Sequence, residues 1–162
     1  MTTEEIYEYI ISRDEDKVWK SACEIIDSGQ NHRKIKPLIE FLPLIVERTK
    51  NLNLGGMFAS NQRFVDFAIK TINFHKNEKV CYCGLYVEKY FLTNDIVKRE
   101  LQYECFNPNK ELEKGNIDII DIIHIENKWI DYYKVECKKC KKRYKVEERD
   151  GHYMFWDWSL VI

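Results

Sequence analysis

Two pairs of cysteines constrain the fold of this chain more than any other feature. Residues 81–84 read C-Y-C-G and residues 137–140 read C-K-K-C. A short turn that carries two cysteines presents two thiolates to one ion, and zinc prefers four ligands at tetrahedral corners. The two segments are far apart in the sequence, so the fold must bring them together. We therefore predict a zinc-ribbon-like site with one structural Zn²⁺ held by Cys81, Cys83, Cys137 and Cys140.

Other interpretations of the cysteines stay open. Residues 137–140 could form a redox pair, although a thioredoxin-like site needs a βαβ context that the sequence does not predict. The four cysteines could also be unrelated buried thiols. Cys105 or His75 could replace one ligand of the first pair. Cys23 lies next to the apolar face of an expected helix, which favours a core thiol.

The N-terminus bears on the redox compartment. It begins Met-Thr-Thr-Glu-Glu and has neither the basic region nor the apolar region of a signal peptide. The apolar stretches are too short to span a membrane. We therefore expect a cytoplasmic protein without a membrane partner. Thiols stay reduced in that compartment, which favours metal over disulfides.

The first half of the chain has the period of α-helices. Apolar residues keep helical spacing in residues 3–12 and again in 35–46, where Pro43 should kink or restart the helix. Asp14 and Ser60 are expected to cap the helices that follow them. Successive amphipathic helices joined by short turns are typical of HEAT-like helical hairpins, although a plain bundle would give the same pattern.

The second half has the texture of an antiparallel sheet. Asn107–Asn109 is expected to form a turn, and Asp150-Gly151 should close a hairpin. We predict an α+β protein with a helical lobe in residues 1–78 and a sheet of four or five strands in residues 79–162. The expected strands are 97–106, 117–125, 130–136, 142–149 and 152–161.

Charge and motifs narrow the function classes. The chain has 26 Lys and Arg against 27 Asp and Glu, whereas a nucleic-acid binder usually shows a basic excess. A basic run surrounds the second cysteine pair, but acidic residues follow it at once, so we disfavour nucleic acid as a partner. The sequence has no phosphate-binding loop, nucleophile elbow or zinc-protease motif. We therefore expect a protein that is not an enzyme. The basic run comprises Lys138, Lys139, Lys141, Lys142, Arg143 and Lys145.

The C-terminal segment is rich in aromatic residues. Trp and Tyr dominate the energetics of many protein interfaces. The aromatic side chains could therefore contact a partner, or they could pack in the core of the sheet. The candidate partner-binding residues are Tyr153, Phe155, Trp156 and Trp158.

Residues 137–158 read C-K-K-C-K-K-R-Y-K-V-E-E-R-D-G-H-Y-M-F-W-D-W, and residues 81–86 read C-Y-C-G-L-Y. This pattern resembles small bacterial proteins of polymorphic-toxin immunity loci. The resemblance implies a cytosolic antitoxin that binds and blocks a cognate toxin, with zinc as a structural staple at the four cysteines. The chain departs from the usual pattern at Lys141, where Gly often follows the second Cys. A general protein-interaction adaptor and a nucleic-acid-binding zinc ribbon are the alternatives.

Overall fold

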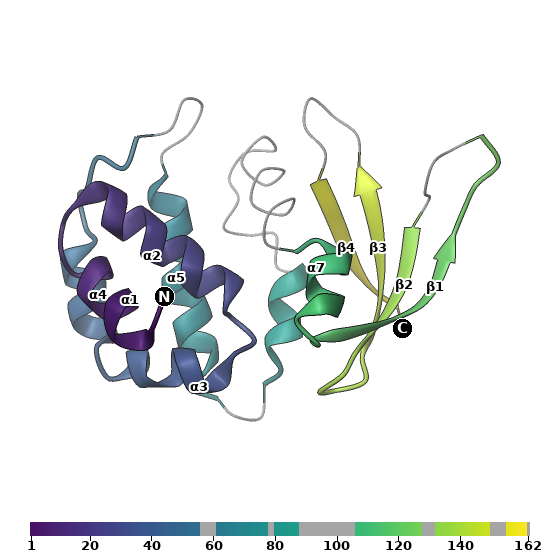
Figure 1. Ribbon diagram of the computed structural model, residues 1–162, viewed down its shortest axis with the longest axis horizontal. Coiled ribbons are helices and arrows are strands. Elements are labelled where there is room, and N and C mark those ends of the chain that lie inside the picture. Colours follow the sequence, from purple (N-terminus) through teal and green to yellow (C-terminus); the bar gives the residue numbers. More distant parts are fainter. Residues whose placement is uncertain (56–60, 78–79, 88–105, 128–131, 150–154, 162) are drawn as a thin grey trace. The chain divides into compact units, whose positions relative to one another are not determined.

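Helices form the N-terminal part of the chain (Figure 1), as the apolar periodicity predicts. The computed structural model describes residues 1–162 except 56–60, 78–79, 88–105, 128–131, 150–154 and 162. The chain divides into two compact units, residues 1–82 and residues 83–162, where the sequence placed a boundary after residue 78. The helices of the first unit are α1 (Thr3–Ile10), α2 (Glu15–Asp27), α3 (His32–Ile35), the 3₁₀ helix η1 (Lys36–Ile39), α4 (Leu42–Arg48) and α5 (Gln62–Phe74).

Local signals set the ends of these helices. The Asp14 side chain accepts a hydrogen bond from the backbone N–H of Lys17 at 3.1 Å, which caps α2 as predicted. Pro43 lies in the first turn of α4, so the segment expected to restart there does so. Asn61, rather than Ser60, occupies the N-cap position of α5, so the cap prediction for Ser60 is wrong. Ser60 itself lies outside the described residues.

The core of residues 1–82 is mainly aliphatic. Helix α2 packs against α5 and against α1, and each of these helices turns one apolar stripe inward. Fully buried members of this core are Ile6, Ile10, Val18, Ala22, Ile25, Ile35, Leu38, Ile45, Val65, Phe67, Ala68 and Ile72. None of the helices in the described part of the chain combines the length and the hydropathy that a membrane span requires.

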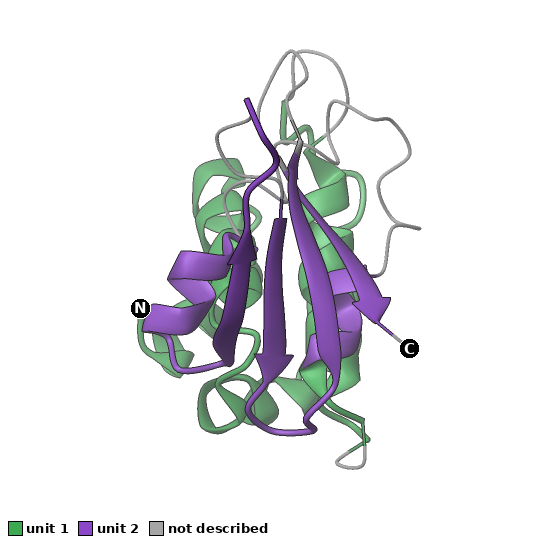
Figure 2. Ribbon diagram, turned by 90° about the vertical axis from the view of Figure 1, so that its right-hand side faces the viewer, with its two compact units in different colours: residues 1–82 green, residues 83–162 purple. Residues whose placement is uncertain are grey.

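Residues 83–162 form the predicted antiparallel sheet (Figure 2). A short 3₁₀ helix, η2 (Tyr82–Val87), begins at the unit boundary, and α7 (Pro108–Glu113) precedes the strands. The strand order is β1-β2-β3-β4, and neighbouring strands are joined by the chain in sequence. The strands are β1 (Ile117–Ile123), β2 (Tyr132–Cys137), β3 (Arg143–Arg149) and β4 (Phe155–Val161).

Three sequence predictions in this unit are not confirmed: one is wrong, and two fall on residues that the structure does not describe. The turn expected at Asn107–Asn109 is wrong, because Asn107 caps α7 and Pro108 lies in its first turn. The Asn107 side chain accepts from the backbone N–H of Asn109 at 2.9 Å. The strand expected at 97–106 lies almost entirely outside the described residues, as does the Asp150-Gly151 turn.

Aromatic rings fill the buried side of the sheet. The ring of Tyr86 stacks on Trp158 with centroids 4.2 Å apart, and Tyr144 meets Trp158 edge-on at 5.8 Å. The indole Nε1–H of Trp158 donates to the carbonyl oxygen of Phe106 at 2.9 Å. A buried indole needs such a partner, so the ring is held in one orientation. Tyr144 of this aromatic cluster lies on β3, directly after the turn that carries the second cysteine pair.

Candidate metal centre

Tyr82 sets the backbone on which the first cysteine pair lies. Its hydroxyl donates to the carbonyl oxygen of Ile26, at the end of α2, at 3.2 Å. Its ring covers Gly29 so closely that a Cβ atom at that position would lie 2.2 Å from the ring. All three residues belong to residues 1–82. These contacts hold Tyr82 in place and so limit the backbone freedom of its two neighbours in the sequence, Cys81 and Cys83.

A tight turn between β2 and β3 carries the second pair. Cys137 ends β2, and its backbone N–H donates to the carbonyl oxygen of Lys142 at 2.9 Å. The backbone N–H of Lys141 donates back to the carbonyl oxygen of Cys137 at 2.9 Å. Lys141 takes φ 62°, the left-handed conformation in which glycine is usually found, at a cost of about 1 kcal/mol. The turn thus keeps the geometry of a knuckle without the glycine.

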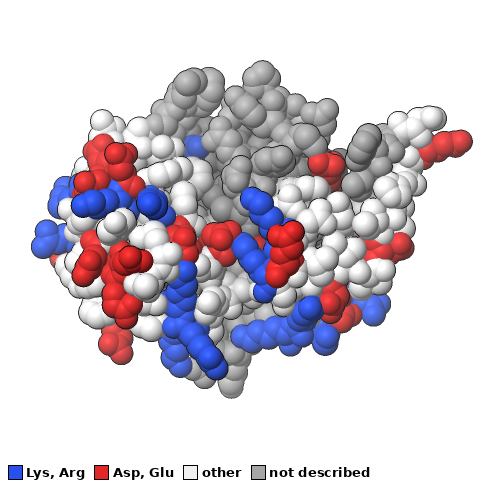
Figure 3. Space-filling view, viewed as in Figure 1, with Lys and Arg blue, Asp and Glu red and all other residues white. Residues whose placement is uncertain are grey.

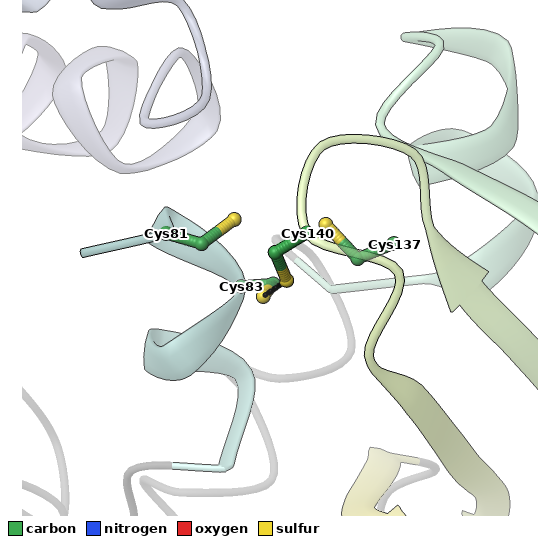
Figure 4. Close-up of side chains that lie close together, drawn as sticks. All are labelled: Cys81, Cys83, Cys137 and Cys140. Atoms are coloured by element: carbon green, nitrogen blue, oxygen red, sulfur yellow. Dashed lines mark hydrogen bonds between the residues drawn. The ribbon is translucent and has the colours of Figure 1, made fainter. Parts of the chain in front are cut away.

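The four sulfur atoms converge (Figure 4). The Sγ atoms of Cys81, Cys83, Cys137 and Cys140 all lie within 4.8 Å of one another. Cys83 and Cys137 are fully buried, whereas Cys81 and Cys140 are partly exposed. Four thiolates around one ion with metal–sulfur bonds of about 2.3 Å would lie about 3.8 Å apart. The cluster has the donor set and the size of a shell that could hold one metal ion.

A tyrosine that the sequence did not single out touches this cluster. The hydroxyl of Tyr144, on β3, donates to Cys83 Sγ at 3.1 Å. Burial raises the pKa of Tyr144 above its ordinary value, and the hydrogen bond to Cys83 and the nearby cysteine sulfurs raise it further. The signal in the sequence is its alternation with Val146, which places both on the buried side of β3.

Two residues, His75 and Cys105, were expected as possible substitutes for a ligand of the first cysteine pair. His75 Nε2 lies 2.7 Å from the carbonyl oxygen of Gly29, and His75 Nδ1 lies 2.9 Å from His32 Nδ1. His75 is therefore engaged elsewhere and is not part of the four-sulfur cluster. Cys105 lies outside the described residues.

Cys23 also stays apart from the cluster. Burial raises the pKa of its thiol to about 11, and the nearby Asp27 carboxylate adds to the effect. Cys23 is not among the four cysteines whose sulfur atoms converge. Cys23 is only partly buried, so it lies at the margin of the core rather than inside it, where the sequence predicted a core thiol.

Two of the four candidate partner-binding residues near the C-terminus are buried, and the side chains of the other two lie outside the described residues. Trp156 and Trp158 are 4% and 0% exposed, so their rings lie in the core, which is the alternative that the sequence left open. Trp156 packs edge-on against Tyr133 with centroids 5.7 Å apart. Tyr153 and the side chain of Phe155 lie outside the described residues. A role for the two tryptophans in partner contact would require them to leave the core.

The basic run around the second cysteine pair is matched by acids. Lys138 pairs with Asp118 at 3.2 Å, and Arg143 and Lys141 pair with Glu136 at 3.2 and 3.5 Å. Figure 3 shows Lys and Arg interspersed with Asp and Glu on the face that it displays. Exposed pairs of this kind contribute little stability, but they cancel the local field. A phosphate backbone is attracted by unmatched positive charge, which these pairs reduce.

No protein-family model matches the chain, and no curated protein or solved structure matches it. The resemblance to immunity proteins and the likeness to HEAT hairpins therefore stay predictions.

Proposed function

We propose that the four cysteines hold one zinc ion as a permanent part of the structure, and that the chain is a binding protein without catalytic activity. The observation that carries the metal proposal is the convergence of four sulfur atoms within 4.8 Å. Four thiolates select zinc or iron rather than the hard cations that prefer oxygen. Clusters of several irons need thiolates spread over several metal ions. The tight spacing here favours a single ion, and zinc is the usual single ion of paired cysteine knuckles.

A structural role follows from the number of ligands. A catalytic zinc keeps one position open for water or substrate, whereas four protein ligands close the tetrahedron. Cys83 and Cys137 are also fully buried, which leaves their side of the site without access for a substrate. These features support a metal that stabilises the fold.

Among binding proteins, we propose an immunity protein that binds and blocks a bacterial toxin. The support is the resemblance of residues 137–158 and 81–86 to proteins of polymorphic-toxin immunity loci. The balanced charge of the chain and the ion pairs of Lys138, Lys141 and Arg143 count against the nucleic-acid alternative. Inhibition by covering a toxin requires only a complementary surface, which needs no catalytic residues of its own.

Metal content tests the first part of the proposal. We expect elemental analysis of the purified protein to give one zinc per chain. Thiol titration should show four protected cysteines that become reactive when a strong chelator is added. One iron per chain would keep the site and change the ion. Protein without metal, in which the four cysteines react freely, would contradict the proposal.

Co-expression tests the second part. The chain is produced together with each toxic protein that is encoded next to its gene, and growth and complex formation are measured. We expect restored growth and a stable complex, and we expect the double variant Cys137→Ser/Cys140→Ser to lose both. Metal-loaded protein that neither protects nor binds would contradict the immunity proposal and leave the zinc site intact.

A further inference from the structure

Tyr144 lies against a sulfur of the four-cysteine cluster and is held there by other aromatic rings. Its side chain is 1% exposed, and its Oη atom lies 3.1 Å from Cys83 Sγ. Tyr86 and Trp158 pack edge-on against its ring with centroids 6.2 and 5.8 Å away. The hydroxyl is therefore aimed at the sulfur by packing and has little freedom to turn elsewhere.

We propose that Tyr144 is a positioning residue of the metal centre, whose hydroxyl donates to the Cys83 thiolate and so strengthens metal binding. This inference rests on the proposed metal site. A divalent ion with four thiolates carries a formal excess of negative charge, and a hydrogen bond to one sulfur spreads that charge. Cys83 is fully buried, so water cannot easily supply the same bond. Partners that orient and tune metal ligands in this way typically change metal affinity by about 10–100-fold.

The neighbouring strand offers a matched control. Tyr133 on β2 is also buried at 4% exposure, and it too packs against a tryptophan of β4. Its hydroxyl lies 3.4 Å from Asn109 Nδ2, rather than against a cysteine sulfur of the cluster. Removing either hydroxyl deletes the same atom from a buried tyrosine of the sheet. Only Tyr144→Phe removes the bond to Cys83.

The experiment compares the metal sites of Tyr144→Phe and Tyr133→Phe with the wild type. Zinc affinity is measured by competition with a chromophoric chelator. The cobalt-substituted proteins are compared through their thiolate-to-metal charge-transfer absorption. We expect Tyr144→Phe to bind zinc about 10–100-fold more weakly. Its charge-transfer band should move to lower energy, because a thiolate without its hydrogen bond gives up electrons more easily. Tyr133→Phe should resemble the wild type in both measurements.

A second substitution covers the case in which Tyr144→Phe does not fold. Incorporation of 3-fluorotyrosine at position 144 keeps the ring and makes the hydroxyl a stronger donor. We then expect tighter zinc binding and a band at higher energy.

The outcomes separate the two proposals. A wild-type protein that takes up neither zinc nor cobalt would overturn the metal site and this inference together. A wild-type protein that binds zinc, with a Tyr144→Phe variant of equal affinity and unshifted absorption, would overturn only the role of Tyr144. A fluorotyrosine variant with the wild-type band would overturn it as well.

Discussion

The two units of this chain are stabilised in different ways. Residues 1–82 bury aliphatic side chains between helices whose ends are set by neighbouring residues, as Asp14 sets the start of α2. Residues 83–162 bury aromatic side chains on one side of a four-stranded sheet and contribute Cys83, Cys137 and Cys140 to the cluster. A domain of about 70–80 residues often needs a staple beyond its hydrophobic core. We infer that metal matters more for the sheet than for the helices.

Removal of the second cysteine pair should have the largest effect and should fall on the sheet. Structural zinc contributes on the order of 10 kcal/mol of binding free energy to folding, so Cys137→Ser/Cys140→Ser should lose metal and several kcal/mol of stability. Hydrogen exchange should show lost protection in β1–β4 and retained protection in α2 and α5. Cys23→Ser is the control and should keep its metal. A soluble double variant as stable as the wild type would contradict the inference that metal stabilises the sheet.

Gly29→Ala should have a smaller effect and should fall on the helices. The new Cβ would lie 2.2 Å from the Tyr82 ring, so the ring must shift and weaken its bond to the Ile26 carbonyl. Overpacking of this kind costs about 1–3 kcal/mol, which chemical denaturation followed by far-ultraviolet circular dichroism can measure.

A double-mutant cycle identifies the cause of that loss. Tyr82→Ala removes the ring, so the added cost of Gly29→Ala should largely disappear in its presence. If Gly29→Ala costs the same with and without the ring, the close approach of Tyr82 to Gly29 is not what limits this position.

The smallest effect concerns reactivity rather than stability. The pKa of Cys23 is about 11, so at pH 8 the folded protein should hold almost none of this thiolate. Alkylation should be about two orders of magnitude slower than for an ordinary thiol with a pKa near 8.5, and it should accelerate as the pH approaches 11. The measurement uses metal-loaded Cys105→Ser protein, with the denatured chain as reference. Equal rates in the folded and denatured chains would show that α2 does not shield this cysteine.

The sequence predicted those elements whose signals are local. Helical periodicity and the Asp14 cap gave α2, and the two cysteine pairs gave the members of the cluster. The role of Asn107 was missed because an Asn-Pro-Asn run starts a turn and a helix equally well. The contact of Tyr144 with Cys83 joins residues far apart in the chain, so no local pattern could indicate it.

Strand β1 forms one edge of the described sheet, and this position has a consequence for solubility. Ile120 and Ile122 are exposed there, and exposed apolar edge strands invite pairing with other molecules. The register with β2 shifts between Ile119 and Asp121, and Asp118 and Asp121 are also exposed on this strand. A bulge twists an edge strand away from a flat partner, and charged side chains on it disfavour pairing with a second copy. Asp118 and Asp121 supply such charges as ion pairs with Lys138 and Lys134, at 3.2 and 3.6 Å. We expect the register shift and these charged pairs to make β1 a poor template for edge-to-edge pairing, although isoleucines are exposed on it.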